Sequence, residues 1–261
     1  MNKQKAKWAL VTGASSGFGV EFATILAEQG SNLVLVARRA EPMEKLAAEL
    51  RSKHGIEVLV EAMDLGHAGV AMELKSYLDS RGIAIDTLIN NAGFGVHGKF
   101  VERPLESTMA MLQLNMLTLT ELTHVFAQDM VKRGGGEILM VASIGGYQAT
   151  PTYAAYSATK AYVLLFGEAL NTELKPHGVR VSVLCPGITA TSFLEVSGQK
   201  MTPYQRVFMM QPRPVAEIGI RAMRRGTPSV VPGVANKVTI FSNRLSPRSV
   251  QSKVAYQLMK N

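Results

Sequence analysis

The chain has 261 residues, 47% of them hydrophobic and 18% charged, which is ordinary for a globular protein with a sizeable core and excludes a mainly disordered chain. The formal net charge of +8 includes no run of five like charges, so it is compatible with an anionic ligand or surface but excludes a basic nucleic-acid arm. The single cysteine, Cys185, excludes an intrachain disulfide and a cysteine-based zinc cluster, and it fits a reducing compartment.

Apolar runs of strand length alternate with longer amphipathic segments along the chain. This alternation predicts one α/β domain over residues 1–261, with a Rossmann-type, doubly wound, mainly parallel seven-stranded sheet covered by helices on both faces. The predicted strands are 8–11, 33–37, 57–62, 87–90, 137–142, 180–184 and 229–231. Helices are expected between them, including a long one from Pro104 to about Lys132.

The first predicted strand leads directly into a glycine-rich turn and then a helical pattern. Glycines let the backbone turn tightly and approach a phosphate, and the helix N-terminus behind them supplies free N–H groups. A βα turn without a ligand stays open as the alternative, because the spacing departs from Gly-x-Gly-x-x-Gly. The predicted cofactor-binding residues of this turn are Gly13, Ser15, Ser16, Gly17, Phe18 and Gly19.

The second predicted strand is followed by Arg38 and Arg39. A dinucleotide fold that selects NAD carries an acidic residue here. Two guanidinium groups, with Ser15 nearby, instead predict binding of the additional phosphate of NADP through charge-assisted hydrogen bonds. A solvated arginine pair at the start of a helix is the alternative interpretation.

Tyr156 and Lys160 are four residues apart in a segment with helical periodicity, so both project from one face of a helix. An ammonium group near a phenol favours the phenolate and lowers the pKa of the tyrosine, which predicts Tyr156 as an acid/base. Ser143 ends the fifth predicted strand, at the edge where open α/β sheets bind ligands. Its hydroxyl is expected to contact a substrate carbonyl, and a turn serine is the alternative. Tyr153 has poorer spacing and is expected to line the pocket or to pack, without a catalytic role.

The sequence resembles the short-chain dehydrogenase/reductase family, in its single-domain NADP-preferring subgroup. The motifs of the resemblance follow the family's order from Thr12 to Thr191: the glycine-rich turn, Asp64-Leu65, Asn90-Asn91-Ala92-Gly93, Tyr156-Ser157-Ala158-Thr159-Lys160 and Pro186-Gly187-Ile188-Thr189-Ala190-Thr191. The resemblance implies an NADP(H)-dependent oxidoreductase that interconverts a carbonyl and an alcohol, with reduction as the expected direction.

The resemblance also implies roles for individual residues. Lys160 would hydrogen-bond the nicotinamide ribose, Ser143 would steady the substrate, and Asn115 would anchor a water that links Lys160 to solvent. A buried Asn115 that is satisfied by backbone groups is the alternative. The remaining implied cofactor contacts are Asp64 and Leu65 near the adenine, Asn91, Ala92 and Gly93 near the adenosine ribose and phosphate, and Pro186, Gly187, Ile188 and Thr191 near the nicotinamide.

Two segments fall outside these motifs. Residues 191–214 are too long for an ordinary connection and are expected to form a substrate lid. Their methionines and aromatic residues predict a hydrophobic carbonyl or alcohol substrate. Residues 246–261 are expected to form a C-terminal helix, with Val250, Val254 and Leu258 at helical spacing among basic residues. Packing against the domain or a second subunit and peripheral contact with an anionic membrane both stay open for this helix.

Several negative expectations complete the sequence interpretation. The apolar stretch after Lys7 ends at Thr12, too early for a secretory signal, so a cytoplasmic protein is expected. The scattered histidines predict no metal site, and the charges form no stripe that would predict nucleic-acid binding. The family resemblance implies a homodimer or homotetramer. An NADPH-binding regulatory or sensor protein without turnover is the alternative function, although it would not need the proton relay.

Overall fold

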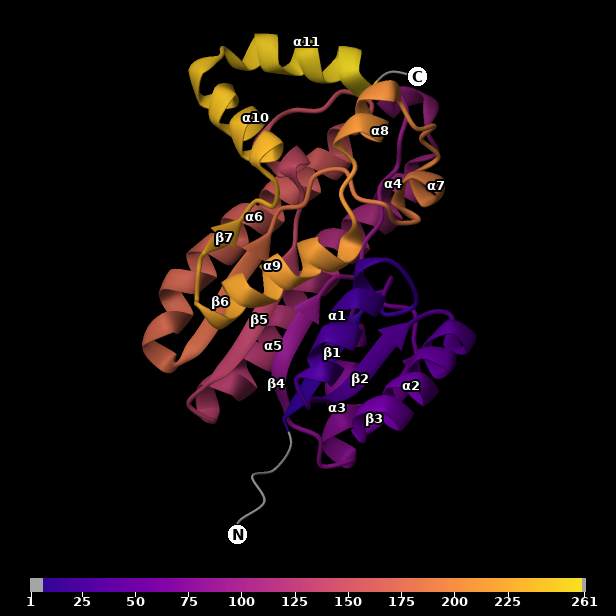
Figure 1. Ribbon diagram of the computed structural model, residues 1–261, viewed down its shortest axis with the longest axis vertical. Helices are drawn as coiled ribbons and strands as arrows, with labels where there is room; N and C mark the ends of the chain where they lie inside the picture. Colours follow the sequence, from indigo (N-terminus) through magenta and orange to yellow (C-terminus); the bar gives the residue numbers. More distant parts are fainter. Residues whose placement is uncertain (1–6, 260–261) are drawn as a thin grey trace.

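The computed structural model describes residues 7–259, apart from the side chains of Pro203 and Tyr204 (Figure 1). At its centre lies a seven-stranded sheet of order β3-β2-β1-β4-β5-β6-β7, in which every neighbouring pair is parallel. The strands are β1 (Trp8–Thr12), β2 (Asn32–Ala37), β3 (Val58–Ala62), β4 (Ile85–Asn90), β5 (Gly136–Val141), β6 (Val179–Leu184) and β7 (Ser229–Val230). The predicted fold class is confirmed, and the seven strands lie close to their predicted bounds.

Helices cover both faces of this sheet (Figure 1). One core lies under α1 (Phe18–Glu28), α2 (Ala40–His54) and α9 (Pro212–Arg224). The other lies under α3 (Val70–Ser80), α5 (Leu119–Lys132) and α6 (Ala154–Leu174). Because successive side chains of a strand point to opposite faces, β1 supplies Ala9 and Val11 to the first core and Leu10 to the second.

Several short elements connect or extend this frame. They are η1 (Phe100–Glu102), α4 (Leu105–Leu112), η2 (Gln113–Thr118), η3 (Ile144–Tyr147), η4 (Lys175–His177), α7 (Phe193–Ser197), α8 (Pro203–Phe208), α10 (Val234–Leu245) and α11 (Arg248–Met259). Helices α7, α8, α10 and α11 lie at the end of the molecule far from the N-terminus (Figure 1). The predicted C-terminal helix corresponds to α11, and its residues 260–261 lie outside the described part of the chain.

Two features differ from the sequence expectations. The long helix expected from Pro104 to Lys132 is divided by η2, a π-helical turn between α4 and α5. Such turns insert one residue into a helix and occur frequently at functional sites, and one inserted residue leaves little trace in the apolar pattern. Helix α10 was not predicted, because Gly233 precedes it without a side-chain cap and its Val, Thr, Ile and Phe residues are weak helix formers.

Thr12 joins the ends of β1 and β4. Its hydroxyl donates to the Ile89 carbonyl at 3.2 Å and accepts from the N–H groups of Asn91 and Ala92, each at 3.0 Å. The Asn91 side-chain amide donates to the Thr12 carbonyl at 2.9 Å. These bonds place the glycine-rich turn after β1 beside the loop after β4.

We expect Thr12→Val to lower the free energy of unfolding by about 1–3 kcal/mol, because the Ala92 N–H loses its acceptor and an unsatisfied buried group costs about that much, whereas the Asn91 N–H also donates to the Ile89 carbonyl. Urea unfolding followed by circular dichroism measures the change. Thr24→Val is the matched control, since the Thr24 hydroxyl bonds only the Val20 carbonyl of its own helix. Equal losses in both variants would contradict this role for Thr12.

Candidate active site

The turn between β1 and α1 holds the predicted phosphate-binding residues. Gly13 and Gly17 have φ values of 68° and 55°, which glycine adopts readily. A Cβ at Gly19 would overlap the Gly13 carbonyl, so the turn tolerates no side chain there. Within residues 7–259, the backbone N–H groups of Ser15, Ser16 and Gly17 bond no backbone acceptor. Free donors at the N-terminus of α1 fit an anionic group.

Arg38 and Arg39 follow β2 and are exposed. The Arg39 guanidinium donates to the Ser15 hydroxyl at 3.5 Å. The structure therefore brings Arg39 next to the glycine-rich turn, and Arg38 lies between it and the end of β2. This arrangement presents donors for a second anionic group beside the first.

The residues expected near an adenosine lie along the adjoining edge. Asp64 is exposed and accepts from the Gly66 N–H at 3.0 Å, whereas Leu65 is buried and its carbonyl accepts from the Thr118 hydroxyl. The Asn91 amide is bonded to β1, so its side chain supports the glycine-rich turn. Ala92 is bonded to Thr12 through its N–H, and Gly93 follows it as an exposed residue.

The segment that follows β6 reaches both parts of the site. The Pro186 carbonyl accepts from the Ile144 N–H at 2.9 Å, which joins it to the loop after β5. A Cβ on Gly17 would lie 3.3 Å from Thr191, so this segment ends over the glycine-rich turn. Between them, Gly187 approaches Asn236 of α10, and the Ile188 carbonyl accepts from the Met210 N–H.

Three of the predicted catalytic residues meet where α6 crosses the end of β5. The Ser143 side chain hydrogen-bonds Tyr156, and its Oγ also accepts from the Gly145 N–H at 3.1 Å. Lys160 is 5% exposed, and its Nζ donates to the Val141 carbonyl at 2.8 Å. The same Nζ lies 5.7 Å from the centre of the Tyr156 ring. A phenol, a hydroxyl and an amine therefore share one site.

Asn115, the fourth predicted catalytic residue, is fully buried in η2. Its Oδ1 accepts from the Phe94 N–H at 3.1 Å, and its Nδ2 donates to the Phe94 carbonyl at 2.9 Å and to the Thr159 hydroxyl at 3.2 Å. A Cβ on Gly93 would lie within 4 Å of both Asn115 and Lys160 Nζ. Asn115 thus lies beside the site. Because both hydrogens of its side-chain amide are donated to protein acceptors, its side chain positions the loop after β4.

The protonation of Tyr156 differs from the sequence expectation. Burial raises the pKa of Tyr156 above its usual range, and the hydrogen bond with Ser143 opposes this rise. Burial thus outweighs the lowering expected from Lys160, and burial also lowers the pKa of Lys160 to about 8. A neutral phenol is a proton donor, so the site favours Tyr156 as an acid at neutral pH.

The buried Lys160 predicts a pH dependence of stability. In an unfolded chain a lysine has a pKa near ~10.4, whereas the folded value is about 8. Between these values the unfolded chain binds a proton that the folded protein does not, so the free energy of unfolding should rise with pH from about 8 to about 10, by up to about 3 kcal/mol. Urea unfolding at a series of pH values tests this. Lys160→Met should lack the rise, and an identical pH profile would assign the effect to other groups.

The predicted lid segment packs on Tyr156. Phe193, the first residue of α7, lies 5.2 Å from Tyr156 and 6.4 Å from Tyr153 between ring centroids. The Tyr153 hydroxyl hydrogen-bonds Ser197 Oγ at 2.8 Å and donates to Gln199 Oε1 at 3.0 Å. Burial raises the pKa of Tyr153 to about 12. Tyr153 therefore holds residues of the 191–214 segment in place.

This network extends to the end of α11, which sequence reasoning missed. The Gln199 amide donates to the Met259 carbonyl at 3.2 Å, and the Gln205 amide donates to Gln199 Oε1 at 2.8 Å. His97 is buried, its ring centroid lies 5.0 Å from that of Tyr153, and its side chain hydrogen-bonds the Met259 backbone. No sequence spacing links residues this far apart along the chain.

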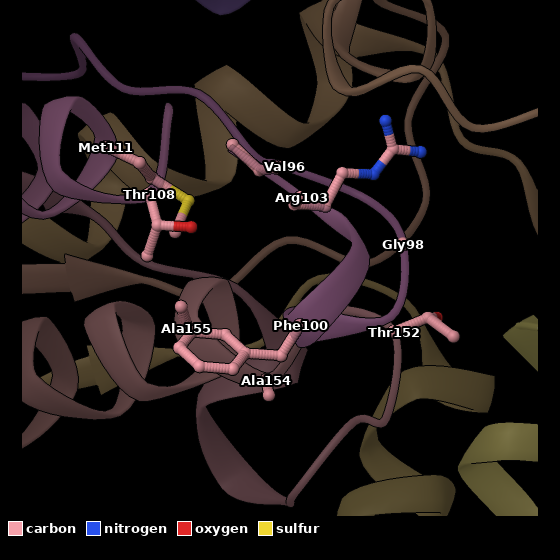
Figure 2. A pocket seen from close by; sticks show the side chains of 9 residues that line it. All are labelled: Val96, Gly98, Phe100, Arg103, Thr108, Met111, Thr152, Ala154 and Ala155. Atoms are coloured by element: carbon pink, nitrogen blue, oxygen red, sulfur yellow. The ribbon is translucent and has the colours of Figure 1, made fainter. Parts of the chain in front are cut away.

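A small pocket lies beside α6 (Figure 2). Ala154 and Ala155 of α6 form one wall, and Phe100 and Met111 also line it. Its volume of about 20 Å³ holds about one water molecule. It is too small for an organic substrate, and neither Tyr156 nor any residue of the 191–214 segment lines it.

Comparison with known proteins identifies the family. The sequence model of the short chain dehydrogenase family matches residues 7–202. The chain belongs to the short chain dehydrogenase family. This short chain dehydrogenase is similar in structure to a short-chain dehydrogenase from Sphingobium yanoikuyae in complex with NADPH, with a TM-score of 0.82, 31% identity and coverage of 92% of this chain and 94% of that one.

Two curated relatives of this short chain dehydrogenase carry reductase names. It is 34% identical over 198 residues to the very-long-chain 3-oxoacyl-CoA reductase of Phaeosphaeria nodorum, covering 74% of this chain but 58% of the relative. It is also 28% identical over 256 residues to the ketoacyl reductase HetN of Nostoc sp., covering 96% of this chain and 88% of that relative. The chain therefore spans under two thirds of the first relative and most of the second.

Proposed function

We propose that the protein is an NADPH-dependent reductase that converts an apolar carbonyl compound to an alcohol. The observation that supports this most directly is the Ser143 side chain hydrogen-bonded to Tyr156, with the buried amine of Lys160 on the same helix face. These groups lie at the carboxyl edge of the sheet, where doubly wound folds bind their ligands.

The chain's own residues fit a dinucleotide with an additional phosphate. The free N–H groups of Ser15, Ser16 and Gly17 would hold the pyrophosphate, and Arg38 and Arg39 would hold the additional phosphate. Asp64 would meet the adenine, and the 186–191 segment would adjoin the nicotinamide. When bound, the cofactor supplies the hydride. The NADPH named in the related Sphingobium complex supports this assignment.

The proton is assigned to Tyr156. The Ser143 hydroxyl orients the substrate carbonyl oxygen and stabilises the negative charge that develops there. Because burial keeps the Tyr156 phenol protonated, its hydroxyl transfers a proton to that oxygen, and an alcohol results. Lys160, fixed by the Val141 carbonyl, supports the phenolate that remains and binds the cofactor ribose.

The substrate class follows from the cover of the site. Phe193 and Tyr153 present aromatic rings around Tyr156, and such a lining favours apolar substrates with a few fixed polar contacts. The named activities of the two curated relatives, on 3-oxoacyl-CoA and ketoacyl compounds, support 3-oxoacyl thioesters as the first group to test. We also propose a homodimer or homotetramer, since Leu105, Met109, Leu117 and Leu165 expose apolar side chains on α4, η2 and α6.

The test is oxidation of NADPH, followed by its absorbance, with a panel of 3-oxoacyl thioesters, bulky apolar ketones, aldehydes and small sugars, and with NADH in parallel. We expect turnover with NADPH and an apolar carbonyl. NADPH binding by thermal shift without turnover on any panel member would favour the sensor function instead. Preference for small hydrophilic sugars would contradict the proposed substrate class.

A further inference from the structure

The excess positive charge of this protein is confined to one part of the chain. Residues 1–217 contain equal numbers of basic and acidic residues, whereas residues 218–261 contain no Asp or Glu. The whole net charge of +8 therefore arises from the basic residues of that second part, which are Arg221, Arg224, Arg225, Lys237, Arg244, Arg248, Lys253 and Lys260.

Helix α10 exposes a row of apolar side chains. Val234, Val238, Phe241 and Leu245 are 77%, 62%, 61% and 76% exposed. Their spacing of four, three and four residues puts them on one face of the helix. Lys237 and Arg244 are exposed, seven residues apart and each adjacent in sequence to a member of the row, so both flank the row on the same side.

Helix α11 also exposes apolar side chains together with basic ones. Val250, Val254 and Leu258 are exposed at intervals of four residues, with Arg248 and Lys253 exposed on the same helix. Across residues 7–259, no ion pair involves Lys237, Arg244, Arg248 or Lys253. The charges of these helices are thus left for an external anionic partner.

We propose that α10 and α11 dock the protein on the surface of an anionic lipid bilayer. A helix with an apolar row and flanking bases lies in the bilayer interface, where the row enters the acyl boundary and the bases meet lipid phosphates. A second copy of the chain fits less well, because a twofold contact through this surface would place bases against bases. No helix within residues 7–259 is long and apolar enough to cross a membrane.

The docking surface is connected to the site. Figure 1 shows α11 as the outermost helix at the end that also carries α7 and α8. The Met259 carbonyl, at the end of α11, accepts from Gln199, and Gln199 accepts from Tyr153. A bilayer under these helices would therefore lie at the side of the molecule from which the 191–214 segment covers Tyr156.

The test is co-sedimentation of the full chain with vesicles, without cofactor or substrate. We expect binding to vesicles of phosphatidylcholine mixed with phosphatidylglycerol, weak binding to phosphatidylcholine alone, and release by salt. The double variants Lys237→Glu/Arg244→Glu and Phe241→Ser/Leu245→Ser should each weaken binding to the mixed vesicles about tenfold or more. Circular dichroism verifies that each variant is folded.

The controls change matched side chains elsewhere. Lys45→Glu on α2 and Met72→Ser on α3 alter exposed residues and should leave vesicle binding unchanged. Failure to bind mixed vesicles, equal binding to neutral vesicles, or unchanged binding by the α10 variants would overturn the proposal. If an α10 variant bound vesicles normally but formed a smaller assembly in solution, the surface would instead be a contact with a second copy of the chain. Reduction of a water-soluble ketone is measured separately, so the two proposals fail independently.

Discussion

Tyr156→Phe should reduce turnover by about 10²–10⁴-fold, because it removes the proton donor of the reduction while keeping the ring. The ring packs on Phe193, so the variant should fold and retain NADPH binding. The measurement is the initial rate of NADPH oxidation with the best carbonyl of the panel, together with the thermal shift on addition of NADPH.

Tyr153→Phe is the matched control. Tyr153 lies on the same face and its ring is 5.6 Å from that of Tyr156, but its hydroxyl is occupied by Ser197 and Gln199. Its loss should change kcat less than about tenfold and act mainly on KM, through a looser 191–214 segment. If the two variants lost kcat equally, or if Tyr156→Phe kept it, the proton assignment would be wrong.

The double variant Arg38→Ala/Arg39→Ala should reverse the cofactor preference. A charge-assisted hydrogen bond contributes about 1.5–3 kcal/mol, so removing two guanidinium groups should raise the KM for NADPH about 10²-fold or more. The KM for NADH should change little, because NADH lacks the phosphate. Initial rates at varied concentrations of each cofactor measure the shift.

Arg225→Ala provides the control for lost positive charge. Arg225 is exposed at the end of α9. It carries the same charge as Arg38 and Arg39 but does not lie near the glycine-rich turn. It should leave both cofactor constants unchanged. An equal rise of the NADPH and NADH constants in the double variant would instead indicate a structural role for the arginine pair.

The sheet was predictable because its strands are buried on both faces and appear as continuous apolar runs between helical patterns. Val181 and Val183 of β6 illustrate this signal, since both are fully buried. Helix α10 escaped prediction because Gly233 precedes it without a side-chain cap and its Val, Thr, Ile and Phe residues are weak helix formers. The π turn at Asn115 was missed for a different reason, since a single residue inserted into a helix hardly changes the pattern of apolar residues.

The candidate site was predictable where sequence spacing determines geometry. Tyr156 and Lys160 come together through one helical turn, and Ser143 joins them because strand ends meet at one edge. The partners of Asn115 and Asn91, and the link from Tyr153 to Met259, depend on contacts between distant segments. Whether the pKa of Tyr156 is raised or lowered depends on how deeply its side chain is buried, and the spacing of charged residues in the sequence does not reveal that burial.

The bonds of Thr12 also constrain how the chain folds. β1 lies in the middle of the sheet, and its Leu10 pairs with Leu88 of β4, so a long loop must close before the central pair forms. The shape of the glycine-rich turn therefore does not depend on the β1–α1 segment alone, because Thr12 is bonded to Asn91 and Ala92 of the loop after β4. During synthesis, the glycine-rich turn leaves the ribosome well before the residues that fix its shape. Until β4 docks, the edge of β1 is unpaired, and that interval is when the nascent chain is most exposed to aggregation.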